Sequence, residues 1–155
     1  MESVNETTES QTTLKTVREI VVNYRGRKRE SVLIASPAVT AEQVRKSLPD
    51  NSREHCVVLY LDGAHRVIGF AVTSTGSANF CHVHPREIFQ RAVLLGAVAI
   101  AIGHNHPSGK PIPSPEDQNV TRTIKEAGTL LGIKLLDHVI VTQSEHFSFM
   151  EDGQL

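Results

Sequence analysis

The sequence lacks most of the features that mark secreted or membrane-bound proteins. It has only two cysteines, Cys56 and Cys81, and no CxxC pair, so we expect two buried thiols in a reducing compartment rather than a disulfide. Its longest apolar run, residues 92–102, is shorter than the ~20 residues that cross a bilayer, and its polar N-terminus lacks the pattern of a signal peptide. These absences predict a cytoplasmic protein without a membrane partner.

The chain also lacks an excess of charge of either sign. Its 16 lysines and arginines nearly balance 17 aspartates and glutamates, for a formal net charge of −1. Because no overall field would then attract nucleic acid, binding of DNA or RNA needs a local basic patch. The candidate is the basic cluster of Arg25, Arg27, Lys28 and Arg29, although an exposed turn is the simpler interpretation of these residues.

What the sequence does have is enough apolar residues for one domain. The chain of 155 residues is 39% hydrophobic, a composition typical of a globular protein with a single core. Residues 1–14 are polar and rich in threonine, serine and glutamate, and we expect them to be disordered. Residues 15–155 are expected to form a single domain.

Strand-like and helix-like segments alternate along this domain. Residues 41–48 have a helical pattern, with Thr40 as the expected N-cap. A second amphipathic pattern predicts a helix that begins near Pro85 and ends near Gly96. The other expected elements are two strands within residues 18–36 around the basic turn, a hairpin over 56–72 with its turn at Asp62-Gly63, strands over 97–102, 133–142 and 146–150, and a helix over 114–132. This order predicts an α/β fold, a mixed β-sheet flanked by helices.

The stretch GHNHPSGKPIPSPED, residues 103–117, gathers histidines, a serine and an aspartate in a proline-rich loop. Residues two apart on an extended chain point to the same side, with Cα atoms about 6.6 Å apart. His104 and His106 can therefore reach one metal ion while Asn105 turns the other way. Zinc in a catalytic site takes three protein ligands and leaves a fourth position open. Asp117 is the candidate third ligand.

Ser114 and Asp117 also have a simpler explanation. Residues 114–117 have the composition of a helix start, with Ser114 as the N-cap, Pro115 in the first turn and acidic residues next to it. The prolines of the loop shift the balance toward a metal site. They restrict the chain between the histidines and Asp117, which lowers the entropy cost of bringing these side chains together.

The pattern H-x-H-x7-S-x2-D resembles the JAMM signature of the JAB/MPN-domain metalloproteases. The surrounding segments VHPREIFQRAVLLGAVAIAIGHNHPSGKPIPSPED and LLDHVIVT resemble the bacterial RadC-like branch of that family. The similarity runs from about residue 30 to the C-terminus. It implies the JAB/MPN architecture, which is cytidine-deaminase-like, and a Zn²⁺ ion bound by His104, His106 and Asp117.

The resemblance also implies roles for two further residues. Ser114 would help to stabilise a tetrahedral intermediate, and a glutamate just before a core strand would act as general base. Glu54 occupies the matching place, whereas spacing by itself does not distinguish it from Glu87 or Glu116. The ion would lower the pKa of its water to ~7 and polarise the scissile carbonyl, and Glu54 would pass a proton from that water to the leaving amine.

Two features depart from the family's pattern. RadC-like proteins carry a preceding helical, DNA-associated domain that has no counterpart in this sequence, and many members have an acidic residue in place of Lys110. The leading hypothesis is a zinc-dependent metallopeptidase or isopeptidase that acts on a peptide or isopeptide substrate. The alternatives are a DNA-associated module that uses the basic cluster and a metal-dependent nuclease. A homodimer, formed through a sheet edge or the first hairpin, is a further expectation.

Three other histidines are expected to have structural roles. His82 and His84 form a second H-x-H, but no serine and aspartate follow at the required spacing, so a role at the helix entry is favoured over metal binding. His138 lies in an apolar strand pattern and is expected to be a hydrogen-bonded core histidine.

Overall fold

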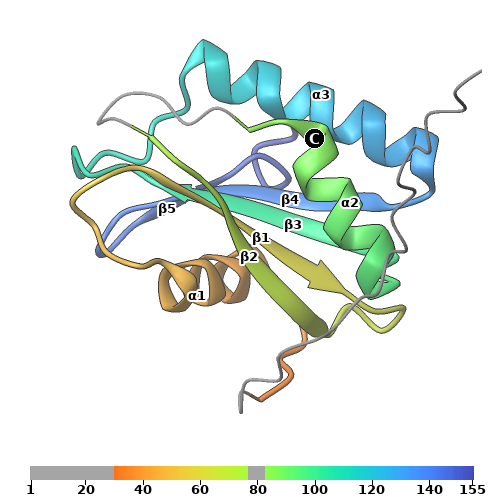
Figure 1. Cartoon of the computed structure of the whole chain (residues 1–155). Helices are drawn as coiled ribbons and strands as arrows, with labels where there is room; N and C mark the ends of the chain where they lie inside the picture. Colours follow the sequence, from red (N-terminus) through yellow and green to blue (C-terminus); the bar gives the residue numbers. More distant parts are fainter. Residues whose placement is uncertain (1–29, 77–82) are drawn as a thin grey trace, which may run out of the picture.

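The computed structural model describes residues 30–76 and 83–155, which form a mixed five-stranded sheet between helices (Figure 1). One helix covers one face of this sheet and two cover the other. The strands are β1 (His55–Leu61), β2 (Val67–Thr75), β3 (Ala99–Asn105), β4 (Lys134–Val141) and β5 (His146–Ser148), and the helices are α1 (Pro37–Ser47), α2 (Pro85–Leu95) and α3 (Pro115–Leu131). The α/β fold predicted from the sequence is confirmed.

The strand order across the sheet is β2-β1-β3-β4-β5. The pair β3 and β4 is parallel, and its crossover contains α3, whereas the other neighbouring pairs are antiparallel. The predicted hairpin is the pair β1 and β2. Because β1 lies antiparallel to β3, the start of β1 and the end of β3 meet at the same edge of the sheet.

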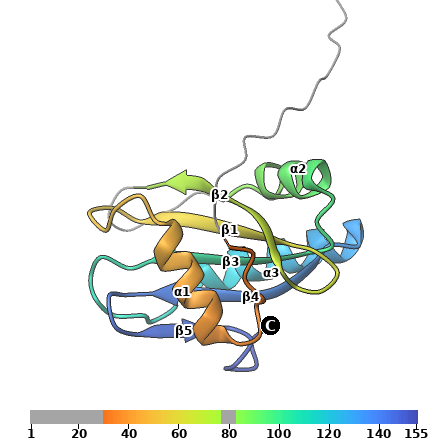
Figure 2. The same ribbon diagram turned by 90° about the horizontal axis from the view of Figure 1, so that it is seen from below.

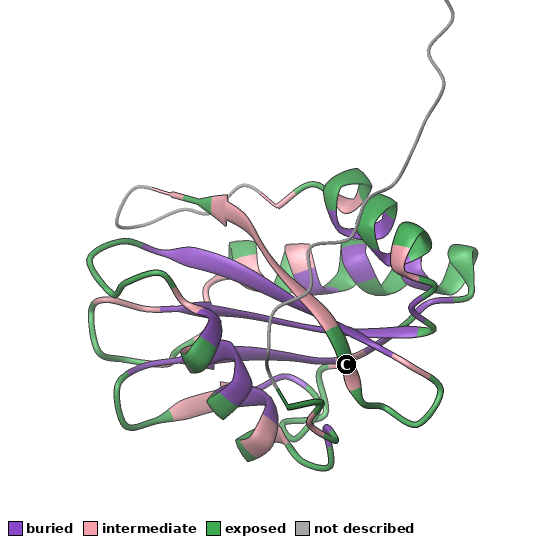
Figure 3. Cartoon of the chain, turned by 60° about the horizontal axis from the view of Figure 1, so that its bottom comes forward, coloured by how far each residue is buried: buried purple, intermediate pink, exposed green. Residues whose placement is uncertain are grey.

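Alternating side chains divide the core into two layers. Along β1, Val58 and Tyr60 pack toward α2 and α3, whereas Val57 and Leu59 pack toward α1. Both layers are buried, which explains why most residues of the central strands are apolar (Figure 3). In β3, Ile100 and Ile102 face α2 and α3, so the period of two places His104 on the same side.

Helix α1 lies close against the strands on the other face (Figure 2). Gly103, which immediately precedes His104, allows this approach. A Cβ atom at this position would lie 2.6 Å from a methyl carbon of Val44 and 2.8 Å from one of Val139. The residue next to the candidate ligand is therefore packed tightly against α1 and the neighbouring strand β4.

Each helix begins with a capping residue followed by proline. Ser36, His84 and Ser114 have extended backbone conformations, and each accepts a hydrogen bond from a backbone N–H of the first turn. The helix-entry role of His84 and the start of α3 at Ser114 are thus confirmed. The prediction of Thr40 as the cap of α1 is wrong, because Pro37 starts that helix earlier and Thr40 lies inside it, with its hydroxyl bonded to the carbonyl of Ser36.

The remaining predictions concern residues near or outside the ends of the described ranges, and one buried cysteine. The second expected strand before α1 is reduced to a single bridge between Leu33 and Arg66. Cys56 is a buried thiol, as expected. The polar tail 1–14, the basic cluster, Cys81 and His82 lie outside the described residues. Within residues 30–76 and 83–155, no helix has the length and apolar character needed to cross a membrane.

Candidate metal centre

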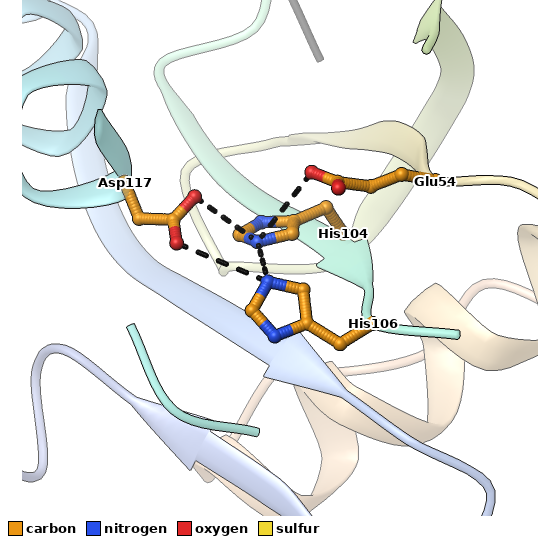
Figure 4. Close-up of side chains that lie close together, drawn as sticks. All are labelled: Glu54, His104, His106 and Asp117. Carbon is orange, nitrogen blue, oxygen red and sulfur yellow. Dashed lines mark hydrogen bonds and ion pairs between the residues drawn. The ribbon is translucent and has the colours of Figure 1, made fainter. Parts of the chain in front are cut away.

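Four side chains from three parts of the fold converge at one edge of the sheet: Glu54, His104, His106 and Asp117 (Figure 4). Each offers a ligand atom, and these atoms all lie within 4.8 Å of one another. We call these four residues the metal cluster. All four had been singled out in the sequence, and the fold brings them together.

The topology explains how the cluster forms. Glu54 immediately precedes β1, and Cys56 pairs with His104 across the antiparallel ladder, so the glutamate lies beside the end of β3. His106 follows directly after β3. The proline-rich loop then leads into α3, whose first turn contains Asp117.

The distances within the cluster suit a small cation with nitrogen and oxygen ligands. His104 Nε2 lies 3.0 Å from His106 Nε2 and 3.2 Å from Asp117 Oδ1, and His106 Nε2 lies 3.9 Å from Asp117 Oδ2. Ligand atoms placed tetrahedrally at about 2.1 Å from an ion are about 3.4 Å apart. The two separations from His104 Nε2 are slightly shorter than this value, and the separation between His106 and Asp117, measured to Oδ2, is slightly longer. Glu54 Oε1 lies 4.0 Å from His104 Nε2, which is the longest of these four separations.

The hydrogen bonds of His106 and Asp117 leave their inward atoms without a proton. The Nδ1 of His106 lies 2.9 Å from the carbonyl oxygen of Lys110, which can only accept, so a neutral His106 carries its proton on Nδ1 and a lone pair on Nε2. The Oδ2 of Asp117 accepts from both the backbone N–H and the hydroxyl of Ser114, each at 2.7 Å. Its Oδ1 is turned toward His104. Lone pairs so close together repel one another, and a bound cation removes this repulsion; the residues therefore fit a metal ion.

The two carboxyl groups of the cluster have opposite pKa shifts. Burial raises the pKa of Glu54 above its usual value, and the neighbouring histidines offset only part of this effect. Burial would also raise the pKa of Asp117, but the hydrogen bond and charge of His104, when that imidazole is protonated, and the hydrogen bonds of Ser114 together lower it well below its usual value. Asp117 is thus held as a carboxylate, while Glu54 is the group in the cluster that more readily accepts a proton.

A cavity of about 200 Å³ opens over the cluster. Val83, Ile102 and Val120 supply apolar wall, and Ser114 and Glu116 supply polar wall. Ser114 therefore lies at the cavity, as its predicted role requires, but its hydroxyl proton is donated to Asp117. Glu116 lies at the cavity without joining the cluster, and Glu87 lies in the first turn of α2.

Asn105 was expected only to turn away from the cluster, and it also fixes the backbone around Glu54. Its side-chain oxygen accepts from the N–H of His55 and its NH₂ group donates to the carbonyl of Arg53, both at 2.8 Å. Arg53 and His55 are the residues on either side of Glu54. The strand that carries the histidines thus holds the glutamate in place. Nothing in the local sequence indicated this contact, because it joins residues about 50 positions apart.

Comparison with known proteins identifies the family of this fold and site. The RadC-like JAB domain matches residues 34–154. The chain belongs to this family. The resemblance seen in the proline-rich loop is thereby confirmed over most of the sequence.

The chain is also similar to proteins named UPF0758. It is 41% identical over 143 residues to one from Geotalea uraniireducens, covering 92% of this chain and 63% of that protein. It is 47% identical over 120 residues to one from Trichlorobacter lovleyi, covering 77% of this chain and 52% of that protein. The chain therefore spans between half and two thirds of the length of these relatives, and the name UPF0758 states no activity.

Proposed function

We propose that this chain is a metal-dependent hydrolase, and more narrowly a zinc metallopeptidase or isopeptidase that cleaves a peptide or isopeptide bond. The metal cluster, in which lone pairs converge under an open cavity, carries this proposal. Two imidazoles and one carboxylate are a ligand set that suits Zn²⁺. RadC-like JAB family membership supports the same reaction class.

The chemistry divides between the ion and the residues around it. When bound, zinc supplies Lewis acidity, which activates water and polarises a carbonyl oxygen. His104, His106 and Asp117, through its Oδ1, would hold the ion. Glu54 is the general base, because its carboxylate lies farther from His104 Nε2 than the ligand atoms of His106 and Asp117 do. Burial raises its pKa, which favours the protonated form after it has accepted a proton. It then passes that proton to the leaving amine.

Ser114 can stabilise an oxyanion only after its hydroxyl has left Asp117. Its hydroxyl donates to Asp117 Oδ2, so donation to an oxyanion requires the hydroxyl to rotate away from that oxygen. The backbone N–H of Ser114 bonds the same oxygen and keeps the carboxylate oriented when the hydroxyl leaves. We propose that Ser114 exchanges these two acceptors during the reaction.

The wall of the cavity favours an amide over a phosphodiester substrate. Glu54, Glu116 and Asp117 line it, and the described lining residues include no lysine or arginine. A phosphodiester brings a negative charge toward these carboxylates, whereas a peptide or isopeptide bond is neutral. Cleavage of nucleic acid is therefore the second candidate, and it shares the same residues.

The test uses the chain of 155 residues, loaded with zinc and assayed on peptides, isopeptide-linked conjugates and DNA. We expect Glu54→Gln to retain the zinc content of the wild type and to lose on the order of 100-fold or more in hydrolysis, the usual contribution of a general base. His106→Ala should lose zinc as well as activity. Glu126→Gln, an exposed glutamate on α3, is the matched control and should behave as wild type.

Three outcomes would change the proposal. Full hydrolysis by Glu54→Gln removes this residue as the base. Cleavage of DNA but of no peptide or isopeptide makes the chain a nuclease. A wild-type protein that takes up no zinc overturns the proposed function as a whole.

A further inference from the structure

Behind the metal cluster, three short hydrogen-bond contacts link His104 to helix α3. His104 Nδ1 lies 2.9 Å from His138 Nε2, and His138 Nδ1 lies 2.6 Å from the hydroxyl oxygen of Thr121. The Thr121 hydroxyl lies 2.7 Å from the backbone carbonyl of Asp117. His104, His138 and Thr121 are all buried. The expectation of a hydrogen-bonded core histidine at 138 is confirmed, and its partner is a residue of the cluster.

We call these three contacts the relay. The number of protons available sets which atom donates and which accepts in each contact. A carbonyl oxygen only accepts, so the one hydroxyl proton of Thr121 goes to Asp117. The Thr121 oxygen must then accept from His138 Nδ1–H. A neutral imidazole carries one ring proton, so His138 Nε2 is an acceptor.

The contact between His138 and His104 determines which ring nitrogen of His104 carries the proton. Its Nδ1 must donate to His138, and its own single ring proton is then used. The lone pair of His104 therefore lies on Nε2, which faces His106 and Asp117 Oδ1. The relay thus connects the backbone carbonyl of Asp117 to the imidazole that faces the carboxylate of the same residue.

The relay depends on a neutral His138, and its surroundings favour that state. His138 is 2% exposed, and its ring packs flat against Phe149 at a centroid distance of 4.7 Å. Its two ring nitrogens bond a hydroxyl and an imidazole rather than a carboxylate.

We propose that His138 and Thr121 are positioning residues that select the Nδ1–H form of His104 and so present its Nε2 lone pair to the metal before the metal binds. The inference rests on the proposed function, because it assigns His104 to a metal ligand set. It deepens that function by naming the residues that prepare the ligand. Outer residues of this kind commonly change metal affinity by 10–100-fold.

A histidine that only fills space would behave differently. Its position would accept any side chain of similar size, whether or not that side chain can donate or accept hydrogen bonds. In the relay, His138→Gln keeps an acceptor for His104 and a donor for Thr121, whereas His138→Leu removes both. Thr121→Ser keeps the hydroxyl, whereas Thr121→Val removes it at nearly the same shape.

The experiment has two readouts, neither of which needs a substrate. The first is the two-bond ¹H–¹⁵N NMR spectrum of the imidazoles in the metal-free protein, at a pH about two units above the ordinary histidine pKa of about 6.5. We expect His104 and His138 both to carry the proton on Nδ1. The second is zinc affinity, measured by competition with a chelating dye.

We expect Thr121→Val and His138→Leu to weaken zinc binding by roughly 10–100-fold, and Thr121→Ser and His138→Gln to restore most of it. Thr129→Val is the matched control, because Thr129 makes the same hydroxyl-to-carbonyl bond, to Lys125, at an exposed position of the same helix. It should bind zinc as the wild type does.

Two results would overturn the inference. The first is a wild-type spectrum with the His104 proton on Nε2, which is decisive even if a variant fails to fold. The second is folded Thr121→Val with wild-type zinc affinity. A protein with the expected spectrum and zinc affinity but no hydrolysis contradicts the proposed function and leaves the relay standing.

Discussion

Asp117 shows how one residue can serve the fold and the candidate site through different atoms. Its Oδ2 completes the capping box with Ser114, its backbone carbonyl accepts the Thr121 hydroxyl proton of the relay, and its Oδ1 faces the cluster. The capping and metal-binding interpretations of the sequence were therefore not exclusive. The cap orients the carboxylate, and this orientation leaves one oxygen for a ligand.

His138 makes the stability of the metal-free protein depend on pH. Its pKa is lower in the folded than in the unfolded state because it is buried, so below about pH 6.5 the unfolded chain binds a proton that the fold excludes. The stabilising effect of a neutral His138 is fully present above that pH and is lost as the pH falls through it. We expect this residue to contribute a slope of up to about 1.4 kcal/mol per pH unit between roughly pH 6 and pH 5.

Chemical denaturation of the metal-free protein at a series of pH values measures this slope. His138→Gln has no group that titrates here and should lose that part of the pH dependence. His146→Gln, on half-exposed β5, is the control and should keep it. Equal slopes in the wild type and His138→Gln would contradict the prediction.

At the level of elements, the candidate site depends on how two neighbouring strands are joined. Asn105, at the end of β3, is fully buried and clamps the backbone on both sides of Glu54 at the start of β1. The clamp therefore ties the segment that carries Glu54 to the strand that carries His104. The clamp uses the side chain that points away from the cluster, so it does not compete with ligand binding.

We expect Asn105→Ala to lower hydrolysis far more than zinc binding. Loss of the clamp frees the Glu54 backbone, and a shift of about 1 Å in a catalytic group can cost on the order of 100-fold in rate. The measurements are kcat for the zinc-loaded protein and zinc affinity, side by side. Asn51→Ala is the control, because it removes a partner of Asn105 that does not flank Glu54. A variant that loses zinc in proportion to activity would show that Asn105 supports the ligands instead.

Helix starts were the element boundaries most readily predicted from sequence. Ser114-Pro115 and His84-Pro85 combine a capping side chain with a residue whose fixed backbone angle suits the first turn. The same rule applied to Ser36-Pro37 would have found the true start of α1. Thr40 was preferred there because of Gln43, and this choice was wrong because the first-turn proline already sets where the helix begins.

At the level of the whole molecule, the metal cluster joins the two central strands to the crossover helix. A metal ion that binds there would bind the folded chain in preference to the unfolded one, and so would stabilise the entire domain. Zinc at 100 times its dissociation constant should add about 2.7 kcal/mol to the free energy of unfolding. For a domain of this size, that corresponds to a rise in Tm of roughly 5–10 °C.

Thermal unfolding with and without zinc, after treatment with a chelator, measures this effect. Glu54→Gln should show the full rise because it keeps the three proposed ligands. His106→Ala should show little or none. A wild-type Tm that does not respond to zinc, or an equal response in His106→Ala, would contradict metal binding at the cluster.

The sequence by itself determined what depends on near neighbours in the chain. The period of two in a strand places His104 and His106 on one side, and the Ser114-Pro115 start places Asp117 in a first turn, because backbone geometry alone sets both relations. Only the tertiary structure decided that Glu54 joins them and that His138 lies behind His104. Those contacts follow from the antiparallel register that pairs Cys56 with His104 and the parallel register that pairs His138 with Ile102. Registers between distant strands are set by packing of the whole core, and no local pattern contains them.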